Sequence, residues 1–303
     1  MRRRFLHAVH AVPLLLVAAL AACDQNASAD KAPGKSNDGA AQPVPVGEQI
    51  REANGVDLQK LSETQRESFF AMINTESSAC GEAHSLATSL RDDADCRDSK
   101  LVAQFIADRI AAGMTPMDIK QLLEQLAASL QPAEIEIEGR PVFGNPSAPV
   151  TVVVFADFQC PMCKEEAPEL REEVSERRGQ VKLVFKHFPL NGHPRAEPAA
   201  IAVEAAHLQG KFWEMHDLVF ANQTQLEDAD LEKYAKQIPE LDFDKWKTDV
   251  AAETTKAAVN RDRAEGKALA LTGTPTVFVN GRRVTPLLWD GELSGWIDDA
   301  LRR

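Results

Sequence analysis

Two cysteines separated by two residues, Cys160-Pro161-Met162-Cys163, stand where a predicted strand meets a predicted helix. Residues Val150 to Phe155 form an apolar run rich in β-branched side chains, which is typical of a buried strand. Residues Cys160 to Arg178 follow a helical pattern, and Pro161 fits the first helical position, where proline is well tolerated. The pair is therefore expected at the N-terminus of a helix, directly after a strand of the core.

The expected position of Cys160 favours a reactive sulfur. Unpaired backbone N–H groups and the helix dipole stabilise negative charge at a helix N-terminus, which lowers the pKa of a thiol there. Cys163 follows one turn later, close enough to resolve a mixed disulfide. The alternatives are a structural disulfide, half of a zinc site, and a copper(I) site with Met162 as a soft third ligand. We expect thiol–disulfide exchange at the pair, with no metal and no cofactor.

Residues 133–303 show the order of strands and helices of an α/β fold. The pattern predicts a second buried strand, a long amphipathic helix, further helical segments, a strand with a hairpin turn, and a last helix. These elements are expected at Val181 to Phe185, Ile201 to Val219, Asp228 to about Leu271, Thr276 to Val279 with the turn Asn280-Gly281, and Leu293 to Leu301.

Residues 48–132 are expected to form a small, separate all-α domain. Ser62 and Gln65 make a plausible capping box. Thr115 and Pro116 are typical of a helix start, and large apolar side chains then repeat at three- and four-residue steps from Ile119. The pattern predicts three or four short helices that pack into a bundle.

Four segments between residues 140 and 303 resemble the DsbA-like family of thiol:disulfide oxidoreductases in the thioredoxin superfamily. They are FADFQCPMCK (155–164), FKHFPL (185–190, followed by His193-Pro194), GKFWEMH (210–216) and TGTPTVFVNG (272–281). The resemblance implies a thioredoxin-like fold with a helical insertion. It also implies that Pro275 is a cis-proline packed against the cysteine pair, and that Thr274 offers its backbone to an extended substrate.

This resemblance implies an enzyme that acts on exported proteins and exchanges electrons with a membrane redox partner of DsbB or DsbD type. Its direction is open, because Thr274 and the extra N-terminal domain also resemble the DsbC and DsbG isomerases or reductases. The chain departs from the family pattern at two positions. Val154 stands where thioredoxin and DsbA have an acid, and the nearest acid is Asp157. Met162 stands where DsbA has a histidine. Methionine cannot donate a polar hydrogen bond to the Cys160 thiolate, so we expect a less strongly oxidising couple than DsbA.

The N-terminus predicts export and lipid anchoring. Residues 1–22 combine three arginines with a short, interrupted apolar stretch, which is typical of a secretory signal rather than a membrane span. Leu20-Ala21-Ala22-Cys23 resembles the lipobox of bacterial lipoproteins, which implies that Cys23 is lipidated, and Asp24 favours retention at the inner membrane. Residues 23–47 are expected to be a flexible tether to the periplasmic part.

Cys80 and Cys96 are expected to form a structural disulfide, since an even number of thiols remains in an exported chain once Cys23 is lipidated. A helix from Gly81 to Leu90 would leave six residues to fold back, which is just enough for the two cysteines to meet. A second redox centre at this pair is the alternative.

With a net charge of −12, the chain lacks the basic surface that is typical of a nucleic-acid-binding protein. From a different class of function, a copper(I)-binding chaperone or an adaptor remains as a competing hypothesis.

Overall fold

The computed structural model describes residues 49–303. The described residues belong to a single compact unit. The predictions for the signal peptide, Cys23, Asp24 and the tether lie outside the described residues. The predicted boundary near residue 132 stays a prediction. Among the described helices, none is both long and apolar enough to cross a membrane.

The N-terminal part of the described chain is helical, as predicted. It contains α1 (Glu63–Thr75), α2 (Leu86–Asp92), α3 (Arg97–Ala111) and α4 (Pro116–Leu130). The capping box that begins α1 is present, because the Ser62 hydroxyl accepts from the Gln65 N–H and the Gln65 side chain accepts from the Ser62 N–H. Thr115 caps α4 in the same way, by accepting from the N–H of Asp118.

One expected helix in this part is misplaced. The sequence predicts a helix from Gly81 to Leu90, whereas α2 begins only at Leu86. The reason is local: the Ser85 hydroxyl accepts from the Thr88 N–H and so caps the helix there.

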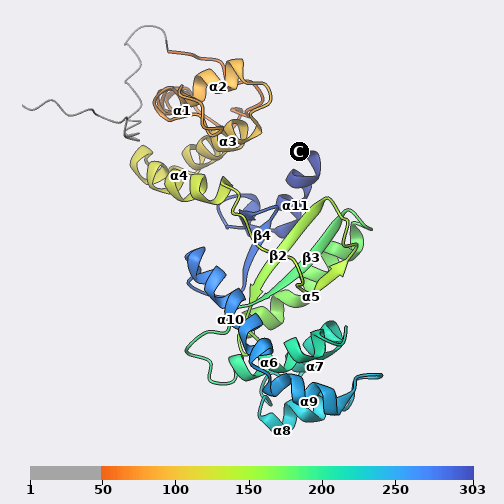
Figure 1. Ribbon diagram of the computed structural model, residues 1–303. Helices are drawn as coiled ribbons and strands as arrows, with labels where there is room; N and C mark the ends of the chain where they lie inside the picture. Colours follow the sequence, from red (N-terminus) through yellow and green to blue (C-terminus); the bar gives the residue numbers. More distant parts are fainter. Residues whose placement is uncertain (1–48) are drawn as a thin grey trace, which may run out of the picture. The chain divides into compact units, whose positions relative to one another are not determined.

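A five-stranded mixed sheet forms the centre of the C-terminal part (Figure 1). Its strands are β1 (Val142–Gly144), β2 (Val150–Ala156), β3 (Val181–His187), β4 (Thr276–Val279) and β5 (Arg282–Arg283), in the spatial order β1-β3-β2-β4-β5. β2 runs parallel to β3 and antiparallel to β4, so that Val154 pairs with Phe185 on one side and with Val277 on the other. The edge strand β1 is only three residues long and was not predicted.

Seven further helices accompany the sheet. They are α5 (Pro161–Glu176), α6 (Ala196–His207), α7 (Phe212–Ala221), α8 (Asp228–Ala235), α9 (Phe243–Ala251), α10 (Glu253–Ala268) and α11 (Leu293–Arg302), with a short 3₁₀ turn at Trp289–Gly291. The prediction of a single long helix from Ile201 to Val219 is wrong, because two helices, α6 and α7, occupy this segment. Gly210 takes φ of 72°, a left-handed conformation that suits glycine, and the chain turns there between α6 and α7.

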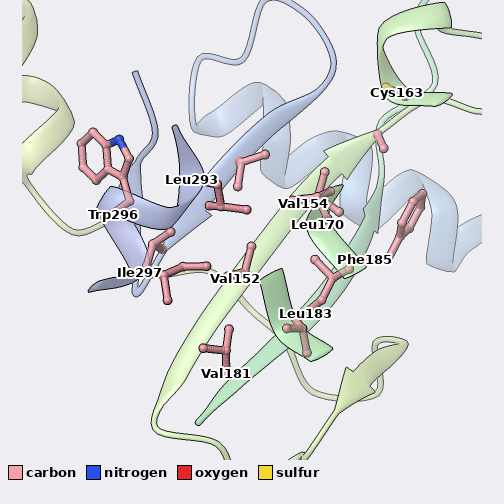
Figure 2. Packing of buried hydrophobic residues seen from close by; sticks show 14 of the residues in the cluster. Val152, Val154, Cys163, Leu170, Val181, Leu183, Phe185, Leu293, Trp296 and Ile297 are labelled. Atoms are coloured by element: carbon pink, nitrogen blue, oxygen red, sulfur yellow. The ribbon is translucent and has the colours of Figure 1, made fainter. Parts of the chain in front are cut away.

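The two faces of the sheet bury different apolar layers. Alternate side chains of a strand point to opposite faces, so Val152 and Val154 of β2 join Leu183 of β3 on one face. Figure 2 shows that α5, through Leu170, and α11, through Ile297, pack against this face. The opposite face holds a smaller cluster, in which strand residues meet two loop residues, Phe188 and Leu271. Its members are Val153, Phe155, Val184, Phe188, Leu271 and Phe278. The thioredoxin-like α/β fold expected from the sequence is confirmed.

Candidate functional site

The cysteine pair lies at the N-terminus of α5, beyond the C-terminal end of β2. Cys160 is the N-cap residue, with extended backbone at φ −76° and ψ 120°, and Pro161 is the first helical residue. Both thiols are free. Met162 is 58% exposed, whereas Cys163 is 2% exposed and faces the interior. The local arrangement is the one that the sequence predicts.

The segment that ends at β4 lies against Cys160. The peptide bond between Thr274 and Pro275 is cis, as the family resemblance implied. The Cys160 thiol donates to the carbonyl oxygen of Thr274 at 3.3 Å. The Gln223 amide, from beyond α7, donates to the Cys160 carbonyl oxygen at 2.7 Å. Residues that are far apart in sequence therefore surround the first sulfur.

Cys163 has a different environment. Burial raises the pKa of its thiol to about 12, even though a hydrogen bond from the Asp157 backbone N–H, at 3.4 Å from Sγ, opposes the rise. A buried thiol with such a pKa is protonated at neutral pH. The second sulfur is thus held as a neutral group under the first turn of α5.

Asp157 supports the site in a way that the sequence did not reveal. Its carboxylate is 1% exposed and accepts from the Gln159 N–H at 2.6 Å and the Leu190 N–H at 2.8 Å. It also contacts Nδ1 of His193 at 2.8 Å. These contacts attach the loop after β3 to the turn that carries Cys160. The signal in the sequence was an acid directly after a buried strand, but two of its partners, Leu190 and His193, lie more than thirty residues away.

A buried charge network lies beside this loop and holds the insertion helices to the sheet. Arg140 contacts Glu204 of α6 at 2.8 Å and Asp262 of α10 at 2.9 Å. Lys186 and the backbone N–H of His187, both in β3, contact Asp262 at 2.9 and 3.0 Å. Burial opposes ionisation of Glu204, but His187 and Arg140 outweigh it and hold its pKa at about 2. No local sequence pattern indicates this network, because Arg140, Glu204 and Asp262 lie far apart in the chain.

Cys80 and Cys96 form a disulfide, with 6.0 Å between their Cα atoms. The bond joins the loop before α2 to the N-cap of α3. The predicted pairing is confirmed, while its role as a structural link stays a prediction.

Comparison with known proteins points to one family for the C-terminal part. A family model described as Thioredoxin matches residues 136–299, more than half of the chain. The probable disulfide bond formation protein D of Bacillus cereus is 34% identical over 155 residues, which cover 47% of this chain and 71% of that protein. The crystal structure of oxidised BdbD from Bacillus subtilis is 26% identical, with a TM-score of 0.50, and covers 57% of this chain and 98% of that chain.

Na(+)/H(+) antiporters also match the chain over a shared segment. NhaA 3 of Salinispora tropica is 44% identical over 143 residues, which cover 47% of this chain. Those residues are only 22% of the antiporter, so the chain spans less than a quarter of that relative.

Proposed function

The chain belongs to the thioredoxin family, whose family model matches residues 136–299, and we propose that it is a thiol:disulfide oxidoreductase. In this proposal Cys160 attacks the substrate disulfide and Cys163 resolves the mixed disulfide that forms. The contrast between the two sulfurs carries the proposal. Cys160 is the N-cap residue of α5, and its thiol donates to the carbonyl oxygen of Thr274, which precedes the cis-proline Pro275. Cys163 lies in the first turn of α5, and its thiol stays protonated at neutral pH, since its pKa is about 12.

The reducing direction illustrates the chemistry. The Cys160 thiolate attacks one sulfur of a substrate disulfide, and the other substrate sulfur leaves as a thiolate. Cys163 then loses its proton and its sulfur attacks Cys160, which releases the second substrate thiolate and leaves a Cys160–Cys163 disulfide. The substrate gains the two electrons that the pair loses, and the oxidising direction is the reverse. We propose that the backbone of Thr274, before Pro275, aligns the substrate as an extended strand.

Trapping tests the roles of the two cysteines. In a Cys163→Ser chain, the mixed disulfide at Cys160 has no resolving thiol, so covalent complexes with envelope proteins should accumulate and dissolve on reduction. The matched Cys160→Ser chain should form none. Equal trapping by both variants, or no reduction of insulin and no oxidation of a reduced protein by the unaltered chain, would rule out this function.

The net direction of thiol–disulfide exchange depends on the substrates, on the redox partner and on the oligomeric state. We propose exported proteins as substrates and a membrane protein of DsbB or DsbD type as the redox partner. Thr274 and the N-terminal helices also fit an isomerase of DsbC or DsbG type. Sedimentation tests this alternative: a stable dimer favours the isomerase, and a monomer favours an oxidase or a reductase.

We also propose that residues 1–22 direct export and that lipid on Cys23 anchors the protein in the periplasm, at the inner membrane if Asp24 acts as a retention signal.

A further inference from the structure

Resolution of the mixed disulfide requires a proton to leave a buried sulfur. The Cys163 thiol has a pKa of about 12 and is 2% exposed, so solvent does not readily take its proton at neutral pH. In the opposite direction, the sulfur that leaves when the Cys160–Cys163 disulfide is opened must gain a proton. A group that exchanges protons with Cys163 would serve both directions.

A cavity of about 10 Å³ borders Cys163 and shows which groups can reach it. That volume is roughly the space of one water molecule. Most of its lining is apolar, and Val154, Leu170 and Phe185, which Figure 2 shows with Cys163, belong to it. Besides Cys163, the titratable side chains that line this cavity are Glu166 and His216.

Asp157 is near Cys163 but does not serve this purpose. Its backbone N–H contacts Sγ of Cys163, while its carboxylate oxygens are occupied by Gln159, Leu190 and His193. The carboxylate is not part of the cavity lining.

His216 is poorly suited to accept the proton. Its Nδ1 lies 2.8 Å from Oδ1 of Asp217, and burial lowers the pKa of the imidazole. The ring packs edge-on against Phe158 and Phe220. A proton accepted at Nε2 would create a cation in this apolar setting, which burial disfavours.

Glu166 connects the cavity to solvent. It follows Cys163 by three residues on α5, so both side chains lie on the same face of the helix. Glu166 also lines an open groove of about 220 Å³ together with Pro275, Thr276 and Arg283. Burial, and then the neighbouring charge of Glu169, raise the pKa of its carboxyl. Of the other charged or titratable groups, His216 of α7 lines the cavity with it, Arg283 of β5 lines the groove with it, and Glu169 lies one turn further along its own helix.

We propose that Glu166 exchanges protons with Cys163, directly or through one water molecule in the cavity, and passes them to solvent through the groove beside Pro275. This inference rests on the proposed function. In resolution, the Glu166 carboxylate takes the proton of the Cys163 thiol, and the resulting thiolate attacks Cys160. The protonated carboxyl then loses the proton to the groove. In the opposite direction, the Glu166 carboxyl protonates Cys163 as that sulfur leaves the disulfide.

Ellman's reagent separates the two steps in a single reaction. One thionitrobenzoate is released when Cys160 attacks the reagent, and a second when Cys163 resolves the mixed disulfide. The full chain with Cys23→Ser is used, so that this predicted lipidation site adds no thiol. Stopped-flow absorbance records both phases in this parent chain, in Glu166→Gln, and in the control Glu165→Gln, which removes the same charge from an exposed neighbouring position.

Glu166→Gln should slow the second phase at pH 7 by tenfold or more, since general base catalysis typically contributes about 10²–10⁴-fold, and change the first phase by less than threefold. Its second-phase rate should rise tenfold per pH unit, because only hydroxide can then take the proton. The parent rate should level off once Glu166 is ionised. Glu165→Gln should follow the parent, and Glu166→Asp should recover part of the rate.

An unchanged second phase in Glu166→Gln, or a loss seen only in His216→Gln, would overturn the inference about Glu166 and leave the oxidoreductase intact. If the parent chain itself never released the second thionitrobenzoate, the proposed function would fail instead.

Discussion

Met162 lies between the two cysteines with 58% of its surface exposed. Its thioether cannot donate a polar hydrogen bond to a thiolate at Cys160. Met162→His should add such a donor and favour the reduced form of the pair. Hydrogen bonds to charged groups contribute about 1.5–3 kcal/mol, so the equilibrium constant with glutathione should move about tenfold or more toward the dithiol. Met162→Leu is the control, and an equal constant for both variants would contradict the expectation.

At the scale of residues, part of the site could be predicted from neighbouring residues in the sequence. The rest depends on tertiary contacts. Cys160 and Cys163 could be found because two thiols on one helical turn have a recognisable spacing. The cis bond at Pro275 followed only from the family resemblance. The burial that sets the pKa of Cys163, and the cavity shared by Val154 and Glu166, depend on strands and helices that meet only in the fold.

Among the elements, the disulfide between Cys80 and Cys96 ties α3 to the loop before α2. A crosslink that closes a loop of this size contributes about 3 kcal/mol in the chain-entropy model. The double variant Cys80→Ala with Cys96→Ala should lose about that much free energy of unfolding in urea, while its Cys160–Cys163 equilibrium with glutathione stays unchanged. A shift of that equilibrium, with little loss of stability, would instead indicate a second redox centre.

The charge network at Glu204 should make stability depend on acid pH. The pKa of Glu204 is about 2 in the folded protein, below its ordinary value near 4.5. The unfolded chain therefore binds more protons between these values, and stability is present above about pH 4.5 and is lost as pH falls toward 2. The contribution is roughly 3 kcal/mol.

Urea unfolding from pH 7 to pH 3 measures the larger part of this contribution, because the pKa of Glu204 is about 4.5 in the unfolded chain and about 2 in the folded protein. Glu204→Gln should be less stable at pH 7 and should lose less stability on acidification than the unaltered chain. Glu197→Gln, on the same helix, removes a carboxylate from a more exposed pair with Arg263 and should cost less than about 1 kcal/mol. The same acid dependence in Glu204→Gln as in the unaltered chain would disprove the assignment.

Most elements were predictable because their periodicity and caps are local. The two buried strands β2 and β3, the helix at Cys160 and the capped starts of α1 and α4 all follow from neighbouring residues. The apolar spacing from Ile201 to Val219 continues across Gly210, so the pattern hid the turn between α6 and α7. β1 is too short to show a period, and its pairing with β3 defines it.

For the whole molecule, anchoring and catalysis should be separable. Residues 1–22 carry three arginines, so their removal would leave 31 basic and 46 acidic residues, a net charge of −15. A chain with that charge is not attracted to anionic lipid, and we therefore expect membrane association to depend on lipid at Cys23. Cys23→Ser should abolish incorporation of labelled palmitate and move the protein from the membrane fraction to the soluble fraction. Its reaction with Ellman's reagent at Cys160 and Cys163 should keep the rates of the lipidated protein. Persistent membrane association without label would show that something other than Cys23 holds the protein there.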